Sequence, residues 1–129
     1  MQKKTEHTIQ LRVRYTECDQ MGVVHHSRYF IYFEIARTEL YRLNGGNHRD
    51  LEAAGVFFVV VNADCKYMRP LRYDDLIEVR VQVTKTTRAK IQHEYQIFRE
   101  GELAAVGHVT LAMIDKAGKI IPIPDEFHV

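Results

Sequence analysis

The segment from Tyr15 to Tyr29, YTECDQMGVVHHSRY, concentrates side chains that can do acid–base or nucleophilic chemistry. It contains the carboxylates of Glu17 and Asp19 and the adjacent imidazoles of His25 and His26. A carboxylate can attack an electrophilic carbon or act as a general base toward water. A backbone N–H at the start of a helix can stabilise the oxyanion that forms on a carbonyl. Two interpretations are open at this point: a polar turn, or a site for acyl transfer.

Two predicted elements flank this segment. Residues 8–15 alternate apolar with polar side chains, which is typical of a strand with one buried face, and Tyr15 is its last inward residue. Residues 27–43 carry apolar side chains at three- and four-residue steps, which predicts a long helix that Gly45 and Gly46 terminate. A strand therefore leads into the segment, and a largely buried helix leads out of it.

The connection between these elements would bring a carboxylate and an N–H donor together. If Ser27 or His26 caps the helix, the first helical N–H groups have no partner within it and carry partial positive charge. Gly22 would let the loop fold back, so that Asp19 faces the same carbonyl carbon. A carboxylate with an N–H donor is a minimal set for acyl transfer.

The rest of the chain predicts a short helix at 48–54 and then strands. These strands are expected at 56–61 with a continuation to 68, and at 76–84, 91–97 and 103–114. The last of them is apolar on both faces, as a central strand is. Because consecutive strands with short connections usually pair antiparallel, we expect an α+β fold. It would be an antiparallel sheet wrapped around one long helix, in a single domain of residues 1–129.

Composition excludes several classes of protein. The 18 Lys and Arg residues nearly cancel the 17 Asp and Glu residues, so net charge does not favour nucleic acid or an anionic membrane. Cys18 and Cys65 are too few for a disulfide framework or a structural zinc site, and the histidines lack metal-ligand spacing. Residues 1–10 lack the apolar run of a signal peptide, and no segment approaches the roughly 20 apolar residues of a membrane span. We expect a cytoplasmic protein without a metal.

The longer segment YTECDQMGVVHHSRYFIYFEIARTEL resembles the 4-hydroxybenzoyl-CoA thioesterase family of hotdog-fold proteins. Within it, the similarity is to the small bacterial acyl-CoA thioesterases associated with the Tol-Pal system. The matching positions are Tyr15, Asp19, Gly22, Val23, Val24, His26, Tyr29, Glu34, Ala36, Arg37 and Glu39, followed later by Pro70, Asp74 and Asp75. The resemblance implies a hotdog fold and hydrolysis of a short-chain or general acyl-CoA to the free acid and coenzyme A. Aromatic acyl-CoAs such as 4-hydroxybenzoyl-CoA are the alternative substrates, and a non-catalytic acyl-CoA-binding module is the alternative function.

The resemblance also implies roles for single residues. Asp19 would be the nucleophile or the general base, and the backbone N–H of His26 would polarise the thioester carbonyl. The side chains of His26 and Tyr15 would assist. Gly22 and Val23 would lie at the substrate.

Two groups of basic residues are candidates for the coenzyme A phosphates, which favour Lys and Arg. The segment TKTTRAKI places Lys85, Arg88 and Lys90 at a predicted strand turn, where a solvated hairpin tip would explain them equally well. A second patch comprises Lys66, Arg69 and Arg72.

Two other acids have simpler interpretations. Glu17 could raise the pKa of Asp19 by repulsion, but we interpret it as an exposed acid. Glu34 lies mid-helix, where another branch of hotdog thioesterases carries its carboxylate, yet an ion pair with Arg37 or a neighbouring subunit suits it better. The resemblance further implies no metal or redox cofactor, and a homotetramer of two dimers with the site at the dimer interface.

Overall fold

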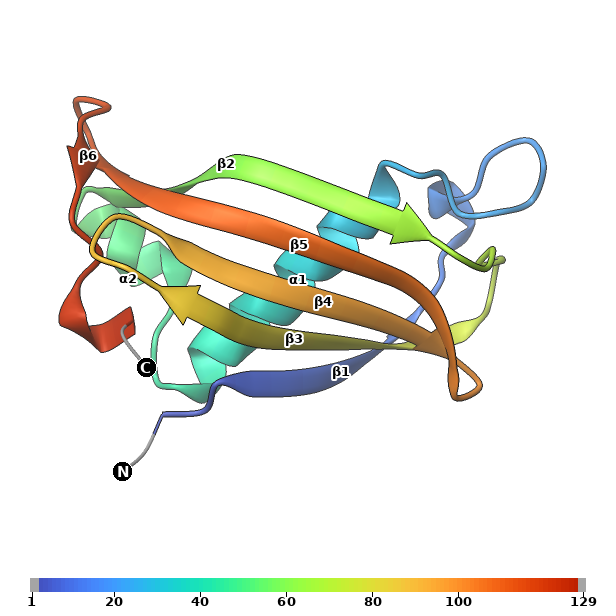
Figure 1. The fold of residues 1–129 in the computed structure, drawn as a ribbon. Coiled ribbons are helices and arrows are strands. Elements are labelled where there is room, and N and C mark those ends of the chain that lie inside the picture. Colours follow the sequence, from blue (N-terminus) through green and yellow to red (C-terminus); the bar gives the residue numbers. More distant parts are fainter. Residues whose placement is uncertain (1–2, 128–129) are drawn as a thin grey trace.

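The computed structural model describes residues 3–127. In chain order its elements are β1 (Glu6–Arg12), the 3₁₀ turn η1 (Tyr15–Glu17), α1 (Arg28–Leu43), α2 (His48–Ala53), β2 (Val56–Tyr67), β3 (Leu76–Thr86), β4 (Ile91–Arg99), β5 (Glu102–Asp115), β6 (Ile120–Ile121) and η2 (Asp125–Phe127). The strands pair antiparallel in the order β1-β3-β4-β5-β2, and β6 pairs with β5. The sheet curves around α1 (Figure 1). The predicted α+β class is confirmed; the short β6 was not predicted.

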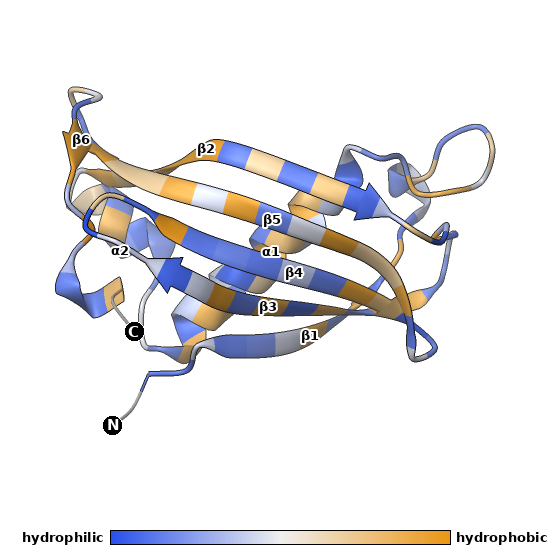
Figure 2. Ribbon diagram, viewed as in Figure 1, coloured by the Kyte–Doolittle hydropathy of each residue, from blue (hydrophilic) through white to orange (hydrophobic). Residues whose placement is uncertain are grey.

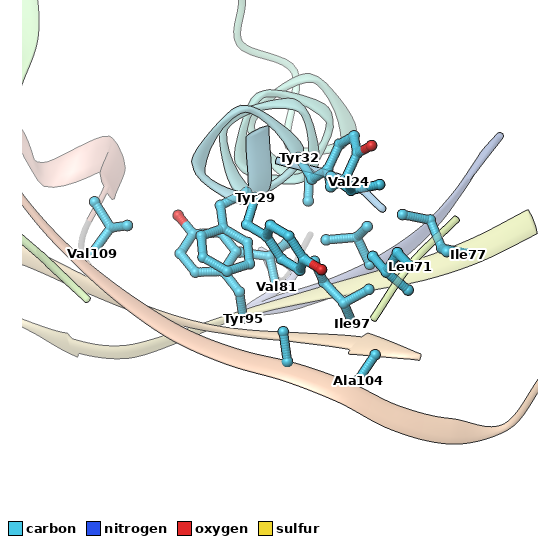
Figure 3. Packing of buried hydrophobic residues seen from close by; sticks show 14 of the residues in the cluster. Val24, Tyr29, Tyr32, Leu71, Ile77, Val81, Tyr95, Ile97, Ala104 and Val109 are labelled. Atoms are coloured by element: carbon cyan, nitrogen blue, oxygen red, sulfur yellow. The ribbon is translucent and has the colours of Figure 1, made fainter. Parts of the chain in front are cut away.

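The core lies between α1 and the concave face of the sheet. The helix contributes a buried stripe with the predicted spacing, made of Tyr29, Tyr32, Phe33, Ala36 and Leu40. On the sheet, alternate residues of β3 and β4 point inward and are fully buried; they include Ile77, Val79, Val81, Tyr95 and Ile97. Figure 3 shows part of this core between the helix and the strands, with Tyr29, Tyr32, Ile77, Val81, Tyr95 and Ile97 labelled. Each fully buried apolar side chain of this size contributes about 1.5–3 kcal/mol of transfer free energy, so this packing fixes α1 against the sheet.

One close approach between α1 and β5 depends on a missing side chain. A Cβ atom at Gly107 would lie 2.2 Å from Cε2 of Phe33, far inside any van der Waals contact. The ring of Phe33 instead lies over the β5 backbone and stacks on Tyr95 with ring centroids 4.5 Å apart. Gly107 therefore sets how closely the helix approaches the sheet.

The outer strands differ in character. Apolar residues of β2 gather in its first half, and polar residues alternate with apolar ones in its second half (Figure 2). Because β2 is the last strand of the pairing order, its outer edge has no strand beside it in residues 3–127. Val60 and Val61 are exposed on it, at 56% and 49%. Such an edge needs cover in a stable protein, as the sequence also indicated.

The first strand ends earlier than predicted. Pairing of β1 with β3 stops at Arg12, and Val13 then exchanges backbone hydrogen bonds with Asp75 and Asp74 in the segment before β3. The chain turns into η1 at Tyr15, whose side chain is 77% exposed. The prediction that Tyr15 is an inward strand residue is therefore wrong, because a 3₁₀ turn interrupts the alternation.

Candidate active site

The connection between β1 and α1 folds back on itself as a tight loop. Cys18 and Val24 form an antiparallel bridge, and the N–H of Asp19 donates to the carbonyl of Val23 at 2.8 Å. Gly22 adopts a φ of 78°, which glycine accepts without strain, and its N–H donates to the carbonyl of Asp19 at 3.0 Å. The reversal that the sequence predicted at Gly22 is present.

A buried carboxylate holds this loop from inside. Glu17 is only 4% exposed, and its side chain accepts hydrogen bonds from the backbone N–H and the guanidinium of Arg14 at 2.8–3.1 Å. The hydroxyl of Tyr32, on α1, donates to Glu17 at 2.8 Å, and the N–H of His25 donates to the Glu17 carbonyl at 2.9 Å. The interpretation of Glu17 as an exposed acid is wrong, since a donor from α1 draws it under the loop.

These contacts set the charge state of Glu17. Burial alone would raise the pKa of its carboxyl, but the hydrogen bonds from Arg14 and Tyr32 and the positive charge of Arg14 outweigh burial and lower the pKa below 4.5. Burial and the bond to Glu17 raise the pKa of Tyr32. The pair is therefore a carboxylate and a neutral phenol at neutral pH, and it ties the loop to α1.

Asp19 lies at the exposed tip of the loop. Its Oδ1 accepts the backbone N–H of Met21 at 2.8 Å and that of Val23 at 3.4 Å. No donor within residues 3–127 reaches Oδ2. The carboxylate thus has one oxygen that fixes its orientation and one that is free to meet a substrate.

The helix start lies next to this carboxylate. Ser27 is the N-cap residue of α1, but its hydroxyl bonds to Nδ1 of His25 at 2.8 Å and caps no helical N–H. The backbone N–H of His26 meets no acceptor in residues 3–127. The hydroxyl of Tyr67 donates to the carbonyl of His26 at 2.9 Å and holds this turn in place. The backbone N–H of His26, two residues before the first residue of α1, is therefore unshared.

Asp19 borders two surface hollows. One also contains Tyr15 and Gly22, and there the ring of Tyr15 lies edge-on to Tyr73 with centroids 5.6 Å apart. The other contains Asp19 together with His26 and Val23, walled by Val24, Tyr29, Tyr67, Met68, Arg69 and Pro70. The structure therefore gathers the other four predicted loop residues around the carboxylate of Asp19.

The predicted phosphate ligands are not placed together with Asp19 in one chain. Lys85, Arg88 and Lys90 lie at the turn between β3 and β4, at the end of the sheet opposite the Asp19 loop (Figure 1). Arg69, of the second basic patch, lines the same hollow as Asp19 and pairs with Glu102 at 3.1 Å. Within one chain, the second patch is therefore the nearer source of positive charge.

Arg72 and Lys66 complete that second patch. Arg72 forms an isolated bridge with Val23, so it lies directly beside the Asp19 loop. Lys66 is exposed near the end of β2.

Among residues 3–127, no group of three or more His, Cys, Asp and Glu side chains could hold a metal ion. In the same part of the chain, no helix is long and apolar enough to cross a membrane.

Three residues of the site were not predicted from the sequence to have a functional role. Tyr32 and Tyr67 anchor the two sides of the loop through partners 15 and 41 residues away, and Tyr73 packs on Tyr15. The helical spacing of Tyr32 predicted only a core position. No local pattern marks Tyr67 or Tyr73, because their partners lie on other elements.

Comparison with known proteins identifies the family. Residues 13–128 match the family model described as the thioesterase-like superfamily. The chain belongs to this superfamily. The acyl-CoA thioesterase YbgC of Haemophilus influenzae is 35% identical over 114 residues, which cover 88% of this chain and 83% of that protein. The family resemblance and the enzyme class that the sequence indicated, a thioester hydrolase, are confirmed.

Solved structures agree with this assignment. The crystal structure of a hypothetical protein from Aquifex aeolicus superimposes with a TM-score of 0.90 at 37% identity, covering 93% of this chain and 94% of that one. A DHNA-CoA thioesterase from Staphylococcus aureus gives a TM-score of 0.90 at 30% identity, covering 95% and 83%. The predicted hotdog fold is confirmed.

Proposed function

We propose that this protein hydrolyses acyl-CoA thioesters, with short-chain or general acyl groups, to the free acid and coenzyme A. One observation carries the proposal. Asp19, with its free carboxylate oxygen, and His26, with its unshared backbone N–H, line the same hollow in a chain of the thioesterase-like superfamily. A carboxylate and an oxyanion donor are the groups that thioester hydrolysis needs.

Two routes of thioester hydrolysis can use these groups. In the covalent route, Oδ2 of Asp19 attacks the thioester carbon. The C–S bond breaks, the coenzyme A thiolate departs, and the acyl group remains on Asp19 as a mixed anhydride. Water then hydrolyses this anhydride. In the general-base route Asp19 takes a proton from water as the water oxygen attacks the same carbon, and the thiolate leaves with that proton. In both routes the N–H of His26 stabilises the oxyanion on the thioester oxygen.

The other predicted residues keep supporting roles in the proposal. The imidazole of His26 and the hydroxyl of Tyr15 are exposed beside Asp19, where they can bond to the substrate or to the attacking water. Gly22 and Val23 form the loop surface that the thioester meets. No metal or redox cofactor takes part, because a thioester carbonyl is already electrophilic.

Assembly would complete the site. We propose a homotetramer of two dimers in the cytoplasm, in which a second chain covers the exposed valines on the edge of β2. Lys85, Arg88 and Lys90 would then bind the coenzyme A phosphates of a site in a neighbouring subunit, because they lie far from Asp19 in their own chain. Arg69 and Arg72 would serve the same phosphates from within the chain.

A substrate panel tests the activity. The purified protein is mixed with acetyl-, butyryl-, palmitoyl- and benzoyl-CoA, and released coenzyme A is trapped with a thiol-reactive dye. Release that saturates with an aliphatic acyl-CoA supports the proposal, and preference for benzoyl-CoA would move the assignment to aromatic substrates. Acyl-CoA binding without release from any member would contradict hydrolysis and favour a non-catalytic binding module.

A further inference from the structure

A second cavity lies at the far end of α1, away from the Asp19 loop. It is partly open to solvent, has a volume of about 120 Å³, and is lined by the last turns of α1, the helix α2, the inner face of the sheet, and the chain near both termini. Its polar lining includes Arg37, His48 and His93, with Lys3 and Lys4 near the N-terminus. None of these residues lines the hollows around Asp19, so the proposed thioesterase mechanism leaves this cavity unused.

His93 lines this cavity and has a buried ring nitrogen without a partner in residues 3–127. Its side chain points inward from β4 and is 7% exposed, and its buried Nδ1 has no hydrogen-bond partner in residues 3–127. Burial, helped by the positive charge of Arg37, lowers the pKa of His93 to about 3, so the imidazole is neutral at physiological pH. Because buried polar atoms are nearly always paired in folded proteins, an unpaired one in a residue that lines a cavity calls for a partner such as a ligand or a water molecule.

Arg37 adds a fixed positive charge. The ion pair with Glu34 that the sequence suggested does not form within residues 3–127. The guanidinium is half-buried and donates to the hydroxyl of Tyr95 at 2.9 Å, and no carboxylate in residues 3–127 lies within ion-pair distance of it. Tyr95 therefore fixes the orientation of a cation that has no ion-pair partner in residues 3–127.

The remaining lining sets the sign and shape of a ligand. Lys3 and Lys4 bring further positive charge, and Glu126 is the one carboxylate among the described residues that line the cavity. The walls are aromatic, with the ring of Phe127 5.1 Å from Tyr41 and 5.2 Å from Phe58, centroid to centroid. An apolar cavity of about 150 Å³ holds a benzene molecule, so this one suits a body of a few carbon atoms. This lining would suit a small anion with a short apolar part.

We propose that this cavity binds a small monocarboxylate. The carboxylate would lie on the guanidinium of Arg37 and accept a hydrogen bond from the imidazole of His93, and a short aliphatic chain would pack against Tyr41, Phe58 and Phe127. Charge-assisted bonds of this kind are the stronger ones available to a carboxylate. The site is separate from Asp19, so it would exist whether or not the protein hydrolyses acyl-CoA.

Butyrate is a suitable probe, and butyramide is its neutral counterpart of the same shape. Both are titrated into the full-length protein while NMR follows the ring nitrogens of His93 and the backbone N–H signals around the cavity. We expect butyrate to shift these signals to saturation with a dissociation constant on the order of 1 mM, given its few atoms. Butyramide should give no saturable shift. Equal shifts with both compounds would overturn the proposal without requiring any variant.

Variants test whether Arg37 and His93 bind the carboxylate of butyrate. Arg37→Met and His93→Phe, which fills part of the cavity, should each weaken butyrate binding at least about tenfold. The control is Arg49→Met, which removes an exposed cation on α2 that does not line the cavity and should leave the affinity unchanged. Butyrate binding that survives both Arg37→Met and His93→Phe, or that Arg49→Met abolishes equally, would show a non-specific effect of charge and refute the site.

Discussion

The buried pair of Glu17 and Tyr32 gives the sharpest prediction about how the active loop is held. Tyr32 is 1% exposed, and its hydroxyl donates to a Glu17 carboxylate oxygen at 2.8 Å. Tyr32→Phe removes only that hydroxyl, so it opens almost no cavity. Hydrogen bonds to charged groups contribute about 1.5–3 kcal/mol, and we expect the free energy of unfolding to fall by about 2 kcal/mol. Glu17→Gln keeps the shape, removes the charge and should lower stability by a similar amount.

The assay is urea unfolding at pH 7 of the wild type, both single variants and the double variant, all at one protein concentration because assembly shifts stability. Since the two changes break the same bond, the double variant should lose at least about 1 kcal/mol less than the sum of the singles. Tyr73→Phe is the matched control: Tyr73 is 57% exposed, and its change should stay within about 0.5 kcal/mol. Additive losses, or a Tyr32→Phe variant as stable as the control, would refute the role given to this pair.

The pH dependence follows from the same contacts. Because the folded state lowers the pKa of Glu17 below 4.5, its stabilisation is fully present above pH 4.5. It is lost as the pH falls through the folded pKa, where the carboxylate is protonated. The free energy of unfolding of the wild type should therefore fall more steeply below pH 4.5 than that of Glu17→Gln. Parallel curves for the two proteins would show that Glu17 is not held as a carboxylate.

Three further predictions concern other contacts. Gly107→Ala should lower the free energy of unfolding by about 1–3 kcal/mol, because the new Cβ meets the ring of Phe33; an unchanged urea midpoint would contradict this. His93 has a pKa of about 3 in the folded state against 6.5 when free, so below pH 6.5 the unfolded state binds its proton first. Between about pH 6 and pH 5 the wild type should lose up to about 1.4 kcal/mol per pH unit more than His93→Phe, and equal slopes in pH-dependent unfolding would refute this. Tyr67→Phe removes the bond to the carbonyl of His26 and should lower kcat/KM by the equivalent of about 0.5–1.5 kcal/mol, with steady-state kinetics as the measurement. Activity equal to wild type would show that this bond does not position the helix start.

The sequence predicted the elements well where one physical signal dominated. The three- and four-residue spacing along α1 and the alternation along β3 reflect burial on one face, and the structure buries that face. The alternation signal failed at Tyr15. The alternation of apolar and polar residues continues to this position in the sequence, but the pairing of β1 with β3 ends at Arg12. The signal failed at Glu17 for a related reason: this acid is buried because Tyr32 supplies a hydrogen-bond donor from a distant position.

Some residues of the site could be predicted from the sequence and others could not. Asp19, Gly22 and His26 lie within eight residues, so the geometry of one loop brings them together, and motif spacing could anticipate it. Arg69 is distant from Asp19 in the sequence and lines the same hollow only because of the fold, from the segment after β2. Residue spacing could therefore not predict that the two lie together. Residue type alone could not rank the two basic groups.

The role of Asp19 is tested most directly by Asp19→Asn on the acyl-CoA that the wild type hydrolyses fastest. Asparagine keeps the shape and the bonds to Met21 and Val23 but is neither nucleophile nor base. We expect kcat/KM to fall by about 10²–10⁴-fold while the urea midpoint stays near the wild-type value. Asp74→Asn, at an exposed carboxylate with a φ of 70° that asparagine tolerates, should retain wild-type kcat/KM. An Asp19→Asn variant that hydrolyses acyl-CoA at the wild-type rate would contradict the account.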